Sequence, residues 1–423
     1  MLDFPLGIWL KKHFDGNDCV WTLPLPPWAT ARERTVRRYR QVARRVVRRR
    51  LVAEHGWGVV LARSLAWPAM AGLKSWLAWR ADVTTGARAA GRKRGFFDLW
   101  WIQLAHNFRI LDQETLAFES PDQRALVRLS IPCFEHQALM DLINRNTGLP
   151  EMEEKRGFAR YCGDHHLPAV DVLAESDGRE TVQFHALPPA DLFLKPADLY
   201  GGKGISALVF HAERGCWVGE KGESLTSGDV LAYANRVQAG HPWVLQPRLR
   251  NSAAWARWSP GALCTLRVVT GRVSPDGPVE ILGGFMRFPR VNAIVDNCSC
   301  GALSSDFDIE TGRLDPARDP ASPWVTVAAH PDTKAPIAGE IIPAWDCVRA
   351  LALRAHAPIQ HVAMIGWDIA LPGDQPVLIE MNLNWGVLTN TPLGRTRYVE
   401  ILRNRLDTPK PEVAAFMAAV LNS

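Results

Sequence analysis

The sequence predicts an α+β protein with a helical N-terminal region, and three observations support this fold class. Apolar residues recur at helical spacing in Arg32–Glu54, near the start of the chain. Residues 150–393 mix short apolar strands with a few helices. Within that part, Ile365–Leu371 and Val377–Asn384 are two apolar strands joined by the turn Pro372–Pro376.

Residues 1–145 form the first region, which we expect to be mostly helical. The expected elements are a loop at Pro24–Pro27 and helices at Arg32–Glu54, Trp57–Arg80 with a break at Pro68, Phe97–Leu111 and Asp122–Asn146. Nine of the 17 tryptophans lie in this region, between Trp9 and Trp101.

The positive charge of the chain concentrates in the same region. Residues 1–100 carry 19 basic and 7 acidic side chains, although the whole chain has a net charge of only +5. Arg32–Arg50 is predicted to be an amphipathic basic helix, because one face is apolar and arginines cover much of the rest. The apolar positions are Val36, Tyr39, Ala43, Val46, Val47 and Leu51, and the arginines are Arg37, Arg38, Arg40, Arg44, Arg45, Arg48 and Arg49.

Three interpretations of this region remain open. The favoured one is a helical cap that packs aromatic residues on the rest of the chain and leaves its arginines in solvent. The second places the basic helix against an anionic membrane face, as a peripheral contact, because basic residues beside Trp and Leu suit that interface. The third, nucleic-acid binding, is not expected, because charge alone supports it.

The remaining regions comprise residues 150–245, 246–393 and 394–423. In residues 150–245 we expect strands Thr181–Leu187, Asp191–Lys195, Ala207–His211 and Cys216–Val218 and helix Ser227–Ala239. In residues 246–393 we expect strands Ala262–Val273 and Val279–Arg287, the Ile365–Asn384 strand pair and a helix near Ile342–His356. Residues 394–423 should hold the closing helices Tyr398–Arg405 and Glu412–Leu421.

Composition is that of an ordinary globular protein, and the cytoplasm is the expected location. Hydrophobic residues make up 47% of the chain, yet about 20 uninterrupted apolar residues never occur together. Lys11 and Lys12 follow the first apolar residues instead of preceding them, so no signal peptide is expected. The eight cysteines form no C-x-x-C motif, which favours reduced thiols.

Polar residues interrupt the two apolar strands near the C-terminus. Asp368 lies in the first strand, and Glu380 and Asn382 lie two residues apart in the second, so they share one face. A carboxylate in a buried strand costs several kcal/mol unless something pairs with it. Three oxygen ligands would suit Mg²⁺, but an internal hydrogen-bonded cluster explains the residues equally well.

A second candidate site is the glycine-rich segment that follows Phe193–Pro196. Gly201, Gly202, Lys203 and Gly204 would let backbone N–H groups approach an anion, and Lys195 could supply a charge for a phosphate. A simple glycine-rich turn is the alternative interpretation. Neither a Walker A loop nor a G-x-G-x-x-G dinucleotide motif occurs in the chain.

The order of these features along the chain resembles the ATP-grasp superfamily. Lys195 is followed by the glycine loop, by Trp243–Pro247, by a strand with arginine and by the Asp…Glu-x-Asn residues. The chain is most similar to the sugar-transfer-associated branch, over about Glu151–Leu393. The matching segments are Thr265–Thr270, Asp296–Gly301, Asp308–Leu314 and Gly366–Asp368. This resemblance implies an ATP-grasp fold, in which residues 150–245 and 246–393 are two α+β subdomains that clamp a nucleotide.

The resemblance also implies roles for individual residues. Nucleotide binding would fall to Lys155, Lys195, the lid residues Gly201, Gly202, Lys203 and Gly204, and the adenine hinge residues Gln246, Pro247, Arg248 and Leu249. Arg267 and Arg287 would hold the γ-phosphate, the acyl-phosphate or the acceptor carboxylate, and Asp368, Glu380 and Asn382 would hold Mg²⁺. The substrate side would include Asp296, Asn297, Gly301 and Asn384. Ala302 departs from the family pattern here, since paired glycines often occupy these positions.

The activity implied is an ATP- and Mg²⁺-dependent ligase that joins a carboxylate to an amine or a thiol through an acyl-phosphate. Its substrates would be small molecules or groups on a carrier, and the family's association points to polysaccharide or other envelope biosynthesis. Two alternatives are a phosphotransferase with the same fold and a nucleotide-binding regulator without turnover.

Overall fold

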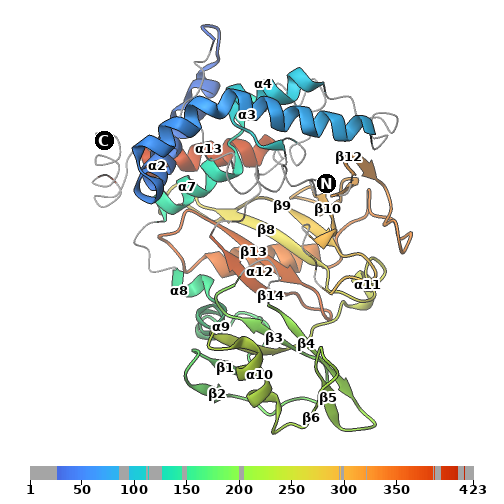
Figure 1. Ribbon diagram of the computed structural model, residues 1–423. Coiled ribbons are helices and arrows are strands. Elements are labelled where there is room, and N and C mark those ends of the chain that lie inside the picture. The colour runs from blue at the N-terminus through green and yellow to red at the C-terminus, as the bar shows by residue number, and fades with distance from the viewer. Residues whose placement is uncertain are drawn as a thin grey trace.

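The computed structural model describes residues 26–84, 95–110, 113, 126–144, 150–199, 204–294, 296, 300–320, 322–383, 385, 392–407 and 414. In these residues the chain forms two seven-stranded antiparallel sheets and a group of helices stacked on the second sheet (Figure 1). The α+β class and the helical N-terminal region that the sequence predicts are therefore confirmed.

The first sheet, called the N-terminal sheet below, has the strand order β2-β1-β7-β3-β4-β5-β6. Its elements are β1 (Ala174–Ser176), β2 (Thr181–Gln183), β3 (Leu192–Pro196), β4 (Ser206–His211), β5 (Cys216–Val218), β6 (Ser224–Leu225), β7 (Trp243–Pro247) and helix α10 (Val230–Gln238). Leu192 and Leu194 of β3 are fully buried in one cluster with Tyr233 of α10. Because side chains alternate along a strand, Phe193 and Lys195 lie on the opposite face, away from α10.

The second sheet, called the C-terminal sheet below, has the strand order β12-β11-β10-β9-β8-β13-β14. Its strands are β8 (Thr265–Gly271), β9 (Glu280–Phe288), β10 (Leu303–Asp306), β11 (Ala317–Asp319), β12 (Ser322–Val327), β13 (Met364–Ala370) and β14 (Val377–Asn382). Every residue of β8 and β13 is buried. Helices must therefore cover both faces of this sheet.

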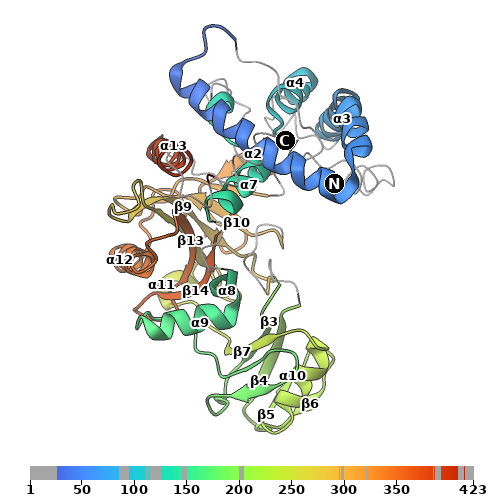
Figure 2. The same cartoon turned by 90° about the vertical axis from the view of Figure 1, so that its left-hand side faces the viewer.

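The helices divide between the two faces of the C-terminal sheet (Figures 1 and 2). Helix α12 packs against one face, where Leu351 and Ala355 belong to the same buried cluster as Leu266 and Val268 of β8. On the other face Val269 of β8 belongs to a cluster with residues of α2, α7 and α13. The helix bounds are α2 (Ala31–His55), α3 (Trp57–Thr84), α4 (Phe96–His106), η2 (Leu126–Leu129), α7 (Cys133–Ile143), α8 (Pro150–Glu153), α9 (Lys155–Asp164), α11 (Ala253–Ala256), α12 (Trp345–His356) and α13 (Pro392–Leu406).

Helix α2 is the predicted amphipathic basic helix, and its start is well defined. Thr30 and Glu33 form a reciprocal capping box, which satisfies backbone donors of the first turn. Val36 and Tyr39 are buried in the cluster that covers the C-terminal sheet, so the helix does cap the rest of the chain.

The expectation that the arginines of α2 lie in solvent is wrong for Arg37, Arg40 and Arg44, which are buried. Arg40 and Arg44 bind the carboxylate of Glu135 on α7 at 2.6 and 2.7 Å, and the side chain of Glu135 is completely buried. An acidic residue about 90 positions away in the sequence therefore neutralises part of the basic helix.

Three helix predictions need correction. Helix α3 runs through Pro68 without the expected break, because packing of Trp67 and Ala71 against α4 offsets the lost backbone hydrogen bond. Helix α4 ends at His106, well before Leu111, because Asn107 adopts the left-handed conformation typical of a helix end. In place of one helix over Asp122–Asn146, η2 and α7 are separated at Pro132.

The predicted strands mostly lie within a few residues of the observed ones, but five strands were missed. These are β1, β6, β10, β11 and β12, which have two to six residues each. The expected helix Glu412–Leu421 lies almost entirely outside the described residues. No helix in the described part of the chain has the length and apolar character needed to cross a bilayer.

Candidate active site

Neighbouring strands of the C-terminal sheet carry polar side chains on one shared face. Asp368 of β13 lies directly opposite Arg267 of β8 on one side and opposite Glu380 of β14 on the other. Arg287 of β9 lies opposite Thr265 of β8. Directly opposite residues in an antiparallel ladder have their side chains on the same face. The register therefore brings together residues that are more than 100 positions apart.

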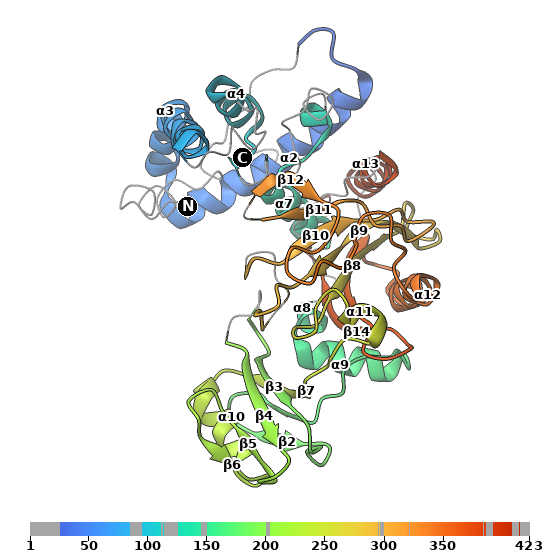
Figure 3. The same cartoon turned by 90° about the vertical axis from the view of Figure 1, so that its right-hand side faces the viewer.

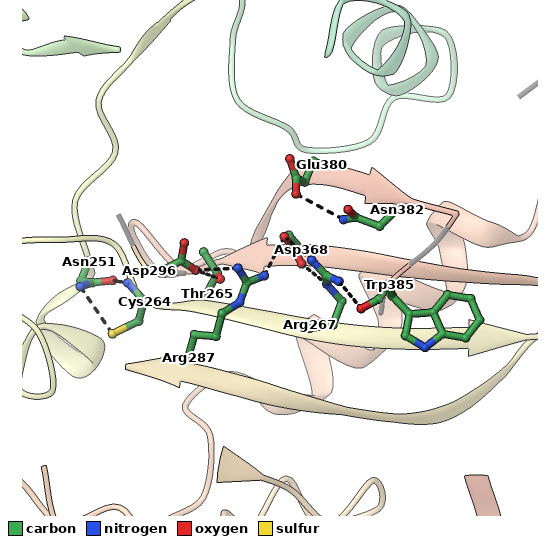
Figure 4. A network of polar contacts seen from close by, with 10 residues as sticks. All are labelled: Asn251, Cys264, Thr265, Arg267, Arg287, Asp296, Asp368, Glu380, Asn382 and Trp385. Atoms are coloured by element: carbon green, nitrogen blue, oxygen red, sulfur yellow. Dashed lines mark hydrogen bonds and ion pairs between the residues drawn. The ribbon is translucent and has the colours of Figure 1, made fainter. Parts of the chain in front are cut away.

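Asp368 is the centre of a buried ion-pair network (Figure 4). Arg267 binds both carboxylate oxygens, through Nε and Nη2, and Arg287 Nη2 lies 2.7 Å from Oδ2. Burial alone would raise the pKa of Asp368, but the two arginines outweigh burial and hold this pKa well below its usual range. Asp368 is therefore a carboxylate whose charge the protein itself neutralises.

Asp296 extends the network toward the solvent. Its Oδ2 lies 3.3 Å from Arg287 Nη1 and also accepts a hydrogen bond from the hydroxyl of Thr265. Arg287 thus lies between two carboxylates, Asp296 and Asp368. This arrangement fixes the guanidinium near the first residue of β8, in the interior of the sheet.

Gly366 allows the close packing behind Arg267. A Cβ at this position would lie 2.7 Å from the Cβ of Trp385 and 3.1 Å from the Cδ of Arg267. The carbonyl of Trp385 accepts a hydrogen bond of 3.1 Å from Arg267 Nη1. The Gly366-Trp-Asp368 segment therefore needs its glycine so that Arg267 can reach Asp368.

Glu380 has a different environment from Asp368, although the two lie side by side. Burial raises the pKa of Glu380, and the neighbouring charge of Asp368 raises it further. The amide of Asn382 donates a hydrogen bond to it, with Nδ2 3.4 Å from Oε1. Glu380 is therefore a carboxylate that an added cation would stabilise.

Two lysines line the same cleft as Glu380. Lys155 begins α9, and its Nζ donates a hydrogen bond of 2.8 Å to the carbonyl of Leu199. Burial lowers the pKa of Lys195 to about 8, and the charge of Glu380 opposes part of that shift. Burial also lowers the pKa of Lys155, again opposed by Glu380. Both ammonium groups are more weakly solvated than surface lysines, which favours binding of an anion.

These groups line one cleft between the two sheets. Its polar lining consists of Lys155, Lys195, Gln246, Thr265, Arg287, Asp296, Asp368 and Glu380. Its apolar lining includes Phe158, Val170, Phe193, Leu199, Ile205, Ile294 and Ile379. One wall is the face of the N-terminal sheet away from α10, since Phe193 and Gln246 are directly paired on β3 and β7.

The other predicted site residues lie at different distances from this cleft. Arg267 lies behind Asp368, and Asn382 lies beside Glu380. Arg248 follows β7 and places its guanidinium 5.2 Å from the ring centroid of Phe193, a residue of the cleft wall. Pro247 ends β7, directly opposite Leu192, and Leu249 follows it in the chain.

Two predicted glycines adopt positive φ angles, which suit glycine. Gly204 has φ +70°, and a Cβ there would lie 2.8 Å from the ring of Pro196. Gly301 has φ +91° and open space around it. The predicted residues Gly201, Gly202, Lys203, Asn297 and Asn384 lie outside the described residues.

Sequence reasoning missed Thr265 and the apolar walls of the cleft. Thr265 is two residues before Arg267, so its position on the same strand face could have indicated it. Phe193 stands in the same relation to Lys195. Ile294 and Val170 come from loops, and no local pattern indicates them.

The donor set of the cleft fits Mg²⁺, but Glu380 and not Asp368 is the carboxylate that is available to the ion. The described residues contain no cluster of three or more His, Cys, Asp or Glu side chains placed to hold a metal ion. Mg²⁺ needs only one or two protein carboxylates when phosphate oxygens and water complete its shell. Glu380 supplies one such carboxylate, with the amide of Asn382 beside it, whereas both oxygens of Asp368 already bind arginine.

The family model described as sugar-transfer associated ATP-grasp matches residues 135–396. No curated protein matches the chain.

Three of the solved structures that match part of the chain are enzymes. D-alanine–D-alanine ligase from Helicobacter pylori is 11% identical, with a TM-score of 0.35, over 60% of this chain and 61% of that chain. Biotin carboxylase from Campylobacter jejuni is 12% identical, with a TM-score of 0.34, over 63% and 49%. Carboxyaminoimidazole ribonucleotide synthase from Aspergillus clavatus, complexed with ATP, is 12% identical, with a TM-score of 0.34, over 65% and 58%. The match spans less than two thirds of each of these three chains.

Proposed function

Because this chain belongs to the sugar-transfer-associated ATP-grasp family, we propose that it is an ATP-dependent ligase that joins a carboxylate to an amine or a thiol. The observation that carries the proposal is the composition of the cleft. Two lysines and one arginine line it together with Glu380, whose pKa is raised, and apolar side chains form the rest of its walls. A triphosphate, a divalent cation and a planar base match these three features.

The N-terminal sheet would bind the nucleotide. Lys155 and Lys195 carry charges for its phosphates, and Phe193 offers an apolar surface for the base. The segment from Gln246 to Leu249 would contact the adenine edge through its backbone, as the family resemblance implies. Gly201, Gly202, Lys203 and Gly204 would close over the phosphates.

Mg²⁺ would be held by Glu380 and Asn382, with Asp368 behind them. When bound, the ion would neutralise phosphate charge and orient the phosphoryl group that is transferred. Asp368 would act mainly through Arg267 and Arg287, because it holds both guanidinium groups in place. Asp296, Asn297, Gly301 and Asn384 would lie on the substrate side.

The reaction needs no side-chain nucleophile. A carboxylate oxygen of the first substrate would attack the γ-phosphorus of ATP, and the bond to the bridging oxygen would break and release ADP. An amine or thiol would then attack the acyl carbon of this acyl-phosphate, lose its proton and expel inorganic phosphate. Arg287, which lines the cleft, would stabilise the charge of the transferred phosphoryl group or of the carboxylate.

The substrate class follows from the family's association with sugar transfer. We propose an acid or acceptor amine that is a small molecule or is attached to a carrier used in surface polysaccharide or related envelope synthesis. The enzyme would work in the cytoplasm, where ATP is available.

Calorimetric titration of ATP tests the nucleotide and metal sites directly. We expect binding that requires Mg²⁺ and is lost in Glu380→Ala. Glu280→Ala is the matched control, because Glu280 lies in the same sheet but binds Arg397, outside the cleft. No binding of ATP to the intact protein, or equal binding by Glu380→Ala, would contradict the proposal.

Screening acids and amines for ADP release then separates the possible activities. A ligase releases phosphate only when both substrates are present, and mass spectrometry should find the joined product. A phosphorylated hydroxyl compound would instead identify a phosphotransferase. ATP binding without turnover in any mixture would favour a nucleotide-binding regulator.

A further inference from the structure

Helix α3 is unusually apolar for a helix at the surface of a protein. Its 28 residues include only four charged side chains, Arg63, Lys74, Arg80 and Asp82. One stripe of α3, which includes Trp67 and Ala71, packs against α4. A helix that is apolar on most sides is normally buried on most sides. In α3 a second apolar stripe is instead exposed.

The exposed stripe continues along most of the helix. Five of its side chains are exposed, and the exposed fraction of Leu65 is 74%. They are Trp57, Leu61, Leu65, Trp76 and Val83. Pro68, Gly72 and Trp79 complete the same line at intervals of three or four residues. This spacing places all of these residues on one side of the helix.

Helix α4 widens the stripe into a patch. The indole of Trp100 donates a hydrogen bond of 3.1 Å to the carbonyl of Pro68 and lies 3.6 Å from where a Cβ of Gly72 would be. Trp100 therefore lies beside the exposed stripe. The ring of Phe97 is 6.5 Å from that of Trp100, and Phe97 is 73% exposed. Trp101 is exposed as well, one helical turn after Phe97.

Basic side chains accompany the exposed tryptophans. The guanidinium of Arg80 lies 5.2 Å from the ring centroid of Trp76, and that of Arg48 on α2 lies 5.6 Å from the ring of Trp57. Asp82, the one acidic residue of α3, is buried. The patch therefore presents aromatic and aliphatic groups, with Arg48 and Arg80 beside two of its tryptophans.

We propose that this face of α3 and α4 docks on the surface of an anionic lipid bilayer. Tryptophan favours the boundary between headgroups and acyl chains, leucine and phenylalanine favour the outer acyl region, and arginine binds phosphate. The helices would lie in the interface without crossing it, in agreement with their lack of membrane-spanning character.

The lipid contact would lie mainly on α3 and α4, with Arg48 as the contribution of α2. Arg37, Arg40 and Arg44 of α2 are buried and cannot reach lipid. Figures 2 and 3 both place α3 and α4 at the end of the molecule opposite β5 and β6. Docking through α3 and α4 would thus leave the cleft between the two sheets accessible to substrates.

Co-sedimentation of the full chain with vesicles tests the proposal. We expect binding to vesicles of phosphatidylcholine with phosphatidylglycerol, and little binding to phosphatidylcholine alone. The variant Leu61→Ser/Leu65→Ser should bind about tenfold or more weakly, because it loses two inserted side chains. The variant Arg48→Gln/Arg80→Gln should lose about fivefold per charge. Brominated acyl chains should quench tryptophan fluorescence on binding.

The matched control replaces exposed apolar residues at the other end of the molecule. Val182→Ser/Phe184→Ser removes side chains that are 48% and 51% exposed on and beside β2, and it should leave vesicle binding unchanged. Thermal melting checks that each variant is folded.

Three results would overturn the proposal. One is no binding of the intact chain to anionic vesicles, and another is an equal loss in the β2 control. The third is a dimer that Leu61→Ser/Leu65→Ser dissociates, in a protein that does not bind vesicles. That result would assign the patch to a second copy of the chain.

Discussion

Asp368 and Glu380 lie directly opposite each other across β13 and β14, yet only Asp368 is neutralised by arginine. The pKa of Asp368 is lowered and that of Glu380 is raised. Two neighbouring carboxylates thereby obtain different roles. Asp368 orders the arginines, and Glu380 remains the group that gains most from a bound cation.

This difference predicts opposite effects on stability. Asp368→Asn should destabilise the fold by about 3–5 kcal/mol, because two buried guanidinium groups lose their counter-charge. Glu380→Gln should be neutral or stabilising at neutral pH, because the folded state binds the Glu380 proton more tightly than the unfolded state does. Urea unfolding of both variants measures the difference. Equal destabilisation would contradict the assigned charge states.

The opposite pKa shifts of Asp368 and Glu380 should also give opposite pH dependences of stability. The depressed pKa of Asp368 means that its contribution is present above its unfolded pKa of about 3.9 and is lost as the pH falls through its folded pKa. The raised pKa of Glu380 means that stability falls as the pH rises from its unfolded to its folded pKa. Glu380→Gln should remove only this second dependence.

Mg²⁺ binding should weaken as the pH falls. A proton and Mg²⁺ compete for the Glu380 carboxylate, and its raised pKa brings this competition closer to neutral pH. Calorimetry from about pH 8 to about pH 5 should show affinity falling by up to about tenfold per unit below that pKa. A flat profile in the intact protein would exclude Glu380 as a metal ligand.

Nucleotide binding should take up a proton near the pKa of Lys195. This pKa is about 8 in the free protein, and a bound phosphate would raise it, so proton uptake should be largest just above pH 8. Titrations in two buffers with different ionisation enthalpies measure the uptake. Lys195→Arg is the control, because arginine stays charged and should abolish the uptake while preserving binding of the anion.

The contact between α2 and α7 should depend on one carboxylate. Glu135→Gln leaves Arg40 and Arg44 buried without their counter-charge, so we expect a loss of about 3–5 kcal/mol. Asp141→Asn removes an exposed ion pair with Arg50 between the same two helices and should cost less than about 1 kcal/mol. Hydrogen exchange of α2, followed with unfolding measurements, should change strongly only for Glu135→Gln.

The sequence predicted correctly those elements that are encoded by neighbouring residues. Helix α2 and the pair β13 and β14 were predicted within two residues of their observed bounds, because their periodicity and the turn between them are encoded by neighbouring residues. Pro68 was misjudged because its cost is offset by packing against α4, a later element of the chain.

The sequence alone determined the α+β class, the family and the spacing that places Glu380 and Asn382 on one strand face. Only the tertiary structure decided that Arg267 and Arg287 neutralise Asp368 and not Glu380, and that Glu135 buries Arg40 and Arg44. The reason is physical. Periodicity records which side of an element is buried, whereas the charge of a buried group depends on the residues that long-range strand register and helix packing place against it.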